Sequence, residues 1–460
     1  MKKTKILFFL IIVSFITVFL ANLIQFNSFP NNHYGSDDYD QLADNLINFN
    51  EFTRIETHNG KNYYFPVLDR VPLYSFTLGV FKFFFYSNKS FFFLNILLFI
   101  LGNLVFYKIL KFFFSRYLCF VILIIFSSSP LVARGLNSAD PQILSYCLFS
   151  FYVYFLIISI KEKKFSLINF FLVIFFSLLL LLTRHNYLFF VIPSIFFLYI
   201  YKKEYLKLFI SFLIIFFIIF LWSFRNYSKT NYFNFSSLLS SSLYIEYVVW
   251  RIPLEQKKIN DNFINDLRIN YLFKPNPKLG TYFKLVDEFH YSQILLYIKN
   301  YPEKFMLNFF KGIYAMHGLS SYPTKHIILS KIYNFDYPQD GASIAVNLKK
   351  KQFDEVFFVK SIFFIFNLLE IIFALFLFLI LTLHLINKSS NINLRIIKLL
   401  SFSTLLYIIF SGIIGGIYYA ERGLVPVFFI YFLMFYNFRA NIEFVINKIK
   451  KKFTKKSYIL

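Results

Sequence analysis

The sequence predicts an all-α polytopic membrane protein. Of its 460 residues, 58% are hydrophobic, 23% are aromatic and only 16% are charged, whereas a soluble domain is about half apolar and a quarter charged. The apolar residues come in repeated runs of about 20, the length that crosses a bilayer as a helix. Lysine and arginine gather between these runs, as they do in the cytoplasmic loops of membrane proteins.

The apolar runs predict about ten transmembrane helices, with boundaries at 6–24, 90–110, 117–135, 141–160, 165–183, 186–201, 206–224, 358–386, 396–417 and 423–437. We expect the first run to be retained as a membrane helix, because no clear small-residue cleavage site follows it. A shorter apolar segment, 72–86, carries Lys82. It could cross the membrane or lie in the interface.

The distribution of charge decides the topology. If 72–86 does not cross, every connection on the side of the N-terminus is basic: Lys108, Lys111 and Arg116; Lys161, Lys163 and Lys164; Lys202, Lys203 and Lys207; Lys388, Arg395 and Lys398; and a lysine-rich tail. We therefore expect 72–86 to be a juxtamembrane or re-entrant element and both termini to be cytoplasmic, in the plasma membrane of a bacterium. The formal net charge of +24 follows from these loops and does not indicate nucleic acid as a partner.

Four parts follow from this topology: an N-terminal transmembrane module at 1–227 with a first outer loop at 25–89, an extracytoplasmic region at 228–357, C-terminal transmembrane helices at 358–437 and a basic cytoplasmic tail at 438–460. The region 228–357 is too long for a simple connection, and its aliphatic stretches favour a small, mostly helical subdomain. Cys119 and Cys147 both lie in apolar runs, where small core residues are expected rather than a disulfide.

The first outer loop concentrates carboxylates. Asp37, Asp38, Asp40 and Asp44 place four aspartates in eight residues of a chain with 24 acidic residues against 48 basic ones. Ser36 is a suitable N-cap, and acids in a first helical turn suit the helix dipole. On such a helix Asp37, Asp40 and Asp44 share one face. A solvated acidic turn between two apolar elements is the plain alternative.

The outer connections each keep a charged residue beside a helix end: Arg70 at the end of the first outer loop, and then Arg134 with Asp140, Arg184 with His185, Arg225, and Glu421 with Arg422. Ionisable groups at such positions are costly unless they are paired or face a cavity, so they are candidates for function. Ordinary capping of helix ends would explain some of them singly.

These motifs, taken in order, resemble the polytopic glycosyltransferases of the GT-C fold, and more narrowly the family 39-like group of protein mannosyltransferases and lipid A aminoarabinose transferases. The resemblance covers 1–230 and part of 400–437. The residues that carry it are Asp37-Asp38-Tyr39-x-x-x-Ala43-x-x-Leu46, Asp69-Arg70-Val71-Pro72-Leu73-Tyr74, Asp140-Pro141, Leu182-Thr183-Arg184, Arg225-Asn226-Tyr227 and Glu421-Arg422. Two departures are that the aspartates directly precede Tyr39 and that Val71 replaces a proline.

The resemblance implies transfer of a sugar, with inversion, from a polyprenyl-phosphate donor to a lipid, glycan or protein acceptor on the extracytoplasmic side. Asp37 or Asp38 would take the proton from the acceptor hydroxyl. Arg70, Arg184, Arg225 and Arg422 would bind the donor phosphate, because arginine matches phosphate oxygens with paired hydrogen bonds. Tyr39, Asp140, His185 and Glu421 would support the site. No cluster of side chains demands a metal, and the sequence leaves open whether a divalent cation takes part.

Three other classes remain. An O-antigen-type polymerase or ligase should carry its essential arginines in the large outer loop. A transporter of lipid-linked glycans should show inverted repeats and broken helices at mid-membrane, and the sequence shows neither. A purely structural membrane protein would not need so many charges at helix ends.

Overall fold

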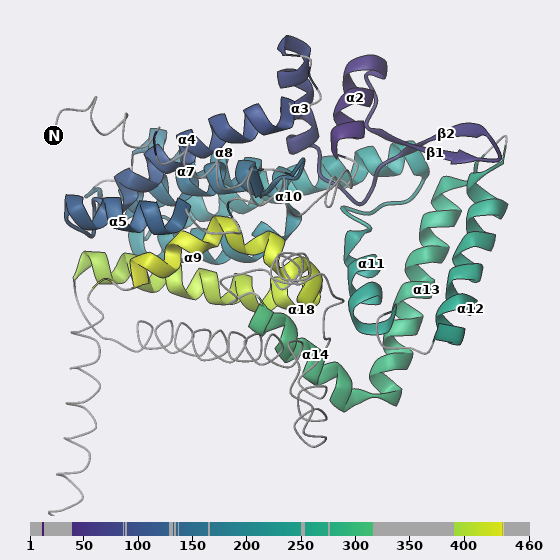
Figure 1. The fold of residues 1–460 in the computed structure, drawn as a ribbon. Coiled ribbons are helices and arrows are strands. Elements are labelled where there is room, and N and C mark those ends of the chain that lie inside the picture. Colours follow the sequence, from purple (N-terminus) through teal and green to yellow (C-terminus); the bar gives the residue numbers. More distant parts are fainter. Residues whose placement is uncertain are drawn as a thin grey trace, which may run out of the picture.

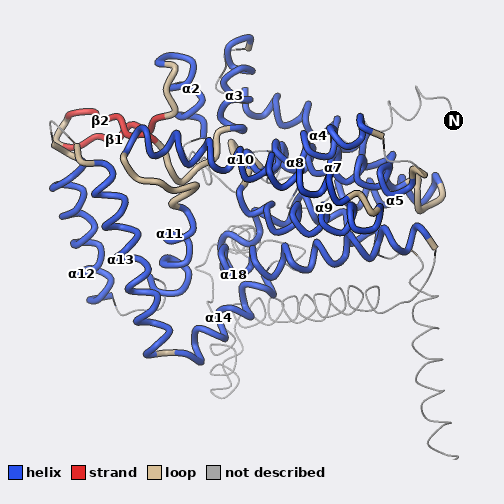
Figure 2. The backbone as a smooth tube through the Cα atoms, turned by 180° about the vertical axis from the view of Figure 1, so that it is seen from behind, coloured by secondary structure: helices blue, strands red, loops and turns tan. Residues whose placement is uncertain are grey.

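The computed structural model describes Ile12 and residues 39–85, 87, 90–127, 132, 135–136, 138–163, 166–249, 254–274, 277–315, 391–434 and 436. The predicted span 358–386, the pair Asp37 and Asp38, Arg134 and the tail 438–460 lie outside these residues, as does the predicted span 6–24 apart from Ile12. The described part has a bundle of apolar helices and a second group of helices, α11 to α14, that runs across the bundle direction (Figures 1 and 2).

The bundle contains α4 (Ser90–Leu110), α5 (Arg116–Ser127), α7 (Gln142–Lys161), α8 (Leu167–Thr183), α9 (Leu188–Lys202), α10 (Tyr205–Thr230) and α18 (Ile392–Met434). α7 packs against α4, α8 and α18, and α18 also packs against α9. Four helices in the described part are long and apolar enough to cross a membrane: α4, α7, α10 and the segment Ile392–Ser411. A mostly helical protein with helices that suit a membrane is therefore confirmed, whereas the count of about ten spans stays a prediction.

Helix α18 covers two of the predicted spans, 396–417 and 423–437. It is 43 residues long, and a straight helix of that length would measure about 65 Å. The side-chain amide nitrogen of Asn393, near its start, nevertheless lies 3.5 Å from the Tyr436 hydroxyl just beyond its end. The chain therefore reverses within α18, and its two arms run side by side (Figure 1).

The basic connections meet at one end of the bundle, which we call the basic end. The Lys161 ammonium lies 4.4 Å from the Phe112 ring centre, and Lys202 donates a hydrogen bond to the Glu162 carbonyl. Arg395 Nη1 donates to the Tyr201 hydroxyl at 3.2 Å. These contacts bring together connections that the charge pattern assigns to a single membrane side. Which side that is stays a prediction.

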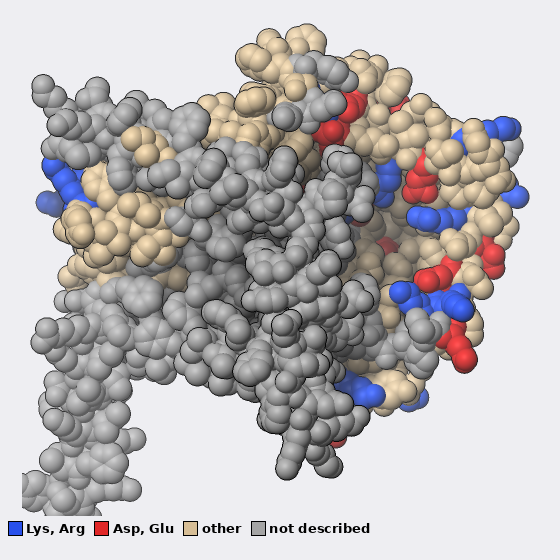
Figure 3. Space-filling view, in the orientation of Figure 1, with Lys and Arg blue, Asp and Glu red and all other residues tan. Residues whose placement is uncertain are grey.

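On the face drawn in Figure 3, only basic side chains are coloured at the left edge, and acidic ones lie toward α2 and α11 to α14. That opposite end begins with α2 (Tyr39–Phe49) and α3 (Leu73–Phe84). α3 has 12 residues, which is about 18 Å of helix and too short for a hydrocarbon core of about 30 Å. α5 has the same length, so whether 72–86 crosses stays a prediction.

A β-hairpin joins α2 to α3, and the all-α prediction missed it. β1 (Thr53–His58) pairs antiparallel with β2 (Lys61–Pro66). The turn is Asn59-Gly60, with φ of 49° and 74°, and Asn-Gly is the pair that two-residue hairpin turns favour because both positions need positive φ. The signal was therefore present in the sequence.

The described part of the 228–357 region is helical, as predicted. It contains α11 (Leu238–Tyr244), α12 (Leu254–Leu267), α13 (Leu279–Asn300) and α14 (Pro302–Ala315), with π-helical turns at Ile245–Val249 and Arg268–Leu272. The buried Asp287 carboxylate fixes the loop before α11 to α13, because it accepts hydrogen bonds from Tyr232, Asn234 and Ser240. Phe65 of β2 packs into a cluster with Leu267, Leu272 and Tyr282, which joins the hairpin to these helices.

Candidate functional site

Four segments far apart in the sequence meet at the end of the bundle opposite the basic end. They are the start of α2, the residues just before and within α3, the loop before α7, and the turn between α8 and α9. Their ionisable and aromatic side chains form what we call the polar cluster: Tyr39, Asp40, Asp69, Arg70, Tyr74, Asp140, Arg184 and His185.

Lys82 of α3 neutralises two of the first-loop acids. Its side chain is only 5% exposed, and its ammonium lies 2.8 Å from Asp40 and 2.7 Å from Asp44. Burial lowers the pKa of Lys82, but the two carboxylates outweigh burial and the pKa is raised. Gly79 of α3 faces α2, and a Cβ there would be in ordinary van der Waals contact with the Ala43 carbonyl oxygen, 3.4 Å away.

Asp69 lies between two arginines. Its carboxylate is 3.4 Å from Arg54 and 3.3 Å from Arg70. Burial raises the pKa of this carboxyl, but the two guanidinium groups prevail and the pKa is lowered, so Asp69 is ionised at neutral pH. Arg70 also lies over the Tyr39 ring, 5.8 Å from its centre. This contact holds Arg70 beside the residue that directly follows Asp37 and Asp38 in the chain.

Asp140 is buried, with only 2% of its surface exposed. It accepts hydrogen bonds from Ser138 Oγ at 3.0 Å, the Gln142 backbone nitrogen at 2.8 Å and the Gln142 side-chain amide at 3.0 Å. The carboxylate therefore satisfies a backbone donor at the start of α7, where the helix dipole favours an anion.

Tyr74 lies between Asp140 and Asp40. Its hydroxyl is buried, and the Asn95 side chain is the hydrogen-bonding group beside it. Burial, followed by the charges of Asp140 and Asp40, raises the pKa of Tyr74 well above its usual value. The Tyr74 ring meets the Tyr39 ring edge to face, with centres 5.5 Å apart. The phenol is thus neutral and lies close enough to both carboxylates to feel their charge.

The turn after α8 presents Arg184 and His185. Burial, then the positive charges of Arg70 and Arg184, lower the pKa of His185 to about 4, although Asp69 opposes them. His185 is therefore neutral at pH 7. Among the residues that the structure describes, none makes a hydrogen bond or ion pair with the Arg184 guanidinium. Arg184 is thus a cation of the polar cluster that the described residues leave unpaired.

Asn186 and Tyr187 fix the same turn to α18. The Asn186 amide donates to the Tyr407 hydroxyl at 3.1 Å and to Ser411 Oγ at 3.3 Å. The Tyr187 ring stacks on Tyr407 with centres 5.4 Å apart. Glu421 and Arg422 lie further along α18, but their side chains are outside the described part, so their predicted roles stay predictions.

Arg225 has a different position from the other predicted phosphate ligands. Its guanidinium donates to the Phe52 carbonyl at 3.2 Å, the Val67 carbonyl at 3.1 Å and the Asn226 side chain at 2.9 Å. It also lies over the Trp222 ring at 5.0 Å. Phe52 precedes β1 and Val67 follows β2, so Arg225 holds the two ends of the hairpin together, with its donors directed at backbone oxygens.

Sequence reasoning did not give roles to Arg54, Tyr74 or Lys82. The signal for Lys82 was its position as a lone charge in an apolar segment, which predicts a buried partner. Arg54 carried no signal, because it becomes relevant only through the hairpin. The described residues contain no group of three or more histidines, cysteines or acids that could hold a metal ion.

No model of a known protein family matches this chain, and no curated protein matches it.

Proposed function

We propose that the protein is a membrane glycosyltransferase that moves a sugar from a polyprenyl-phosphate donor to an acceptor at the end of the bundle where the polar cluster lies. One observation carries the proposal: Arg184 has no described partner and sits near Arg70 and a neutral His185, at the same end as the first-loop acids. A structural ion-pair network would satisfy its cations internally. An arginine that pairs with no side chain in the described part of the chain suits a ligand that brings its own negative charge.

The donor phosphate meets the demands of this arrangement. Cleavage of the bond between the sugar C1 and the phosphate oxygen leaves negative charge on the phosphate, which fixed cations stabilise best in a site with little water. Arg184 supplies paired N–H donors for two phosphate oxygens. Arg70, partly neutralised by Asp69, adds a second positive charge. Arg225 acts indirectly, by holding the hairpin, and Arg422 remains a further candidate.

The contacts of the described aspartates guide the choice of the general base. Asp40 and Asp44 are paired with Lys82, Asp69 with Arg54 and Arg70, and Asp140 accepts three hydrogen bonds. These contacts favour Asp37 or Asp38, which lie outside the described residues, as the general base among the aspartates of the first outer loop. In the proposed step the acceptor oxygen bonds to C1, the C1–phosphate bond breaks, the acceptor proton passes to Asp37 or Asp38, and polyprenyl phosphate leaves.

The test is incorporation of labelled sugar from a polyprenyl-phosphate donor in membranes that contain the full chain. Asp37→Asn or Asp38→Asn should slow transfer by roughly 10²–10⁴-fold, the usual contribution of general-base catalysis, while donor affinity is retained. Asp44→Asn is the matched control, since Asp44 pairs with Lys82, and it should retain most turnover. Near-normal turnover in both Asp37→Asn and Asp38→Asn would remove the first loop from the mechanism.

Substitutions at Arg184 distinguish donor binding from the chemical step in the same assay. Arg184→Gln should weaken donor affinity, and Arg184→Lys should restore it only in part, because a point charge lacks the paired donors of arginine. Translocation of labelled donor across liposomes without transfer to any acceptor would instead indicate a transporter.

A further inference from the structure

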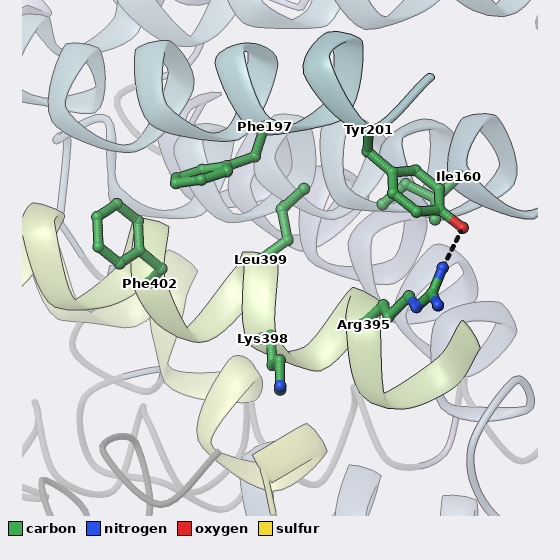
Figure 4. A pocket seen from close by; sticks show the side chains of 7 residues that line it. All are labelled: Ile160, Phe197, Tyr201, Arg395, Lys398, Leu399 and Phe402. Atoms are coloured by element: carbon green, nitrogen blue, oxygen red, sulfur yellow. Dashed lines mark hydrogen bonds between the residues drawn. The ribbon is translucent and has the colours of Figure 1, made fainter. Parts of the chain in front are cut away.

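At the basic end, a groove of about 340 Å³ lies between α9, α18 and the end of α7. Its lining is almost wholly apolar: Ile160, Phe197, Leu399 and Phe402 form the walls, and Tyr201, Arg395 and Lys398 complete it. Phe197 and Phe402 meet edge to face with ring centres 5.0 Å apart. Figure 4 shows the apolar side chains between the two helices and the two cations on the α18 side.

The two cations are three residues apart on α18 and therefore share one face of the helix. Arg395 donates one hydrogen bond to the Tyr201 hydroxyl at 3.2 Å, a neutral partner. Lys398 is close enough to be repelled by Arg395. Neither has an ion pair with any described residue. Two adjacent cations that no described residue neutralises, beside an apolar groove, complement a ligand with an anionic head and a hydrocarbon chain.

We propose that this groove binds an anionic phospholipid from the leaflet at the basic end. One acyl chain lies along Phe197, Leu399 and Phe402, and the phosphate accepts hydrogen bonds from Arg395 and Lys398. Basic pockets between membrane helices on the cytoplasmic side are suited to anionic headgroups. The groove is at the opposite end from the polar cluster, so this site is independent of glycosyl transfer.

Lipid retention tests this proposal. It is measured by native mass spectrometry of the full chain released from detergent micelles. The probes are phosphatidylglycerol and phosphatidylcholine with identical acyl chains, and inorganic phosphate as competitor. Wild-type protein should retain phosphatidylglycerol in preference to phosphatidylcholine, and phosphate should not displace it. Equal retention of the two lipids would refute the charge recognition, and displacement by phosphate would show a soluble-anion site instead.

Variants locate the site. Arg395→Gln combined with Lys398→Gln should lower phosphatidylglycerol retention by roughly tenfold, as expected from removal of two cations near an anionic headgroup. Leu399→Trp should lower it without any change of charge, because the indole fills the groove. Lys163→Gln combined with Lys203→Gln removes the same charge from exposed positions at the same end and is the matched control. An equal loss in the control would reduce the effect to general surface charge and overturn the site.

Discussion

The neutral state of His185 gives the protein a predicted sensitivity to acid. Burial and the charges of Arg70 and Arg184 lower the pKa of His185 from 6.5 to about 4. The folded state thus disfavours the protonated imidazole, while the unfolded chain accepts the proton normally. A group with a lowered folded pKa contributes stability that is present above its unfolded pKa and is lost as pH falls toward the folded one. The sensitive window for His185 is therefore pH 6.5 to 4.

The size of the effect follows from the two pKa values. Between pH 7 and pH 5, linkage gives a loss of about 2 kcal/mol in the free energy of unfolding. His290 of α13 has its pKa lowered to about 4 by burial, so it adds a comparable loss in the same window. The measurement is thermal unfolding of the purified full chain in detergent at pH 7 and pH 5, where losses of this size lower the melting temperature by several degrees.

Substitution separates the two histidines. His185→Gln should remove its own share of the pH dependence and leave that of His290, and the double variant with His290→Gln should show the smallest drop between pH 7 and pH 5. If His185→Gln retains the full acid sensitivity of the wild type, the imidazole is not held neutral by burial and by the charges of Arg70 and Arg184.

Three further substitutions test the packing and pairing of the fold. Gly102→Ala should destabilise the bundle by about 1–3 kcal/mol, because a Cβ there would lie 2.5 Å from the buried Tyr146 ring; an unchanged melting temperature would show that α4 and α7 can separate. Lys82→Met should lower the free energy of unfolding by about 1–2 kcal/mol, less than the loss of one partner of a fully buried pair, because it leaves Asp40 and Asp44 without their counter-ion. Lys82→Arg should recover part of this loss in the same melting assay. Arg225→Lys should expose the hairpin 53–66 to limited proteolysis, because a single ammonium cannot replace the hydrogen bonds to both the Phe52 and Val67 carbonyls. Protease resistance equal to that of the wild type would show instead that the hairpin is held by its packing on Leu267, Leu272 and Tyr282.

Hydropathy located the helices well. The run predicted at 90–110 is α4 (Ser90–Leu110), and those at 141–160 and 165–183 are α7 (Gln142–Lys161) and α8 (Leu167–Thr183). A membrane-length apolar run is a local property, because every residue in it meets the same requirement for burial or contact with lipid. The gathering of basic connections at one end followed from the same kind of evidence. Each span carries the chain to the other side of the membrane, so every second connection lies on the same side.

The outer loop was harder to predict. Its helix at 39–49 agrees with the acidic helix expected there, but the Asn59-Gly60 hairpin was overlooked, although its turn residues were visible. Asp37 and Asp38 lie outside the described residues, so their predicted catalytic role depends on the transfer assay.

The sequence by itself determined that this is a helical membrane protein whose charged residues cluster at span ends. Only the tertiary structure decided which of those charges are already used. Lys82 pairs with Asp44 across 38 positions of the chain, and Arg225 binds the Val67 carbonyl across 158. Arg184, with the same kind of position at a span end, has no described partner. Hydropathy depends on near neighbours in sequence, but an ion pair depends on distance in space, and the packing of α2, α3 and the hairpin sets that distance.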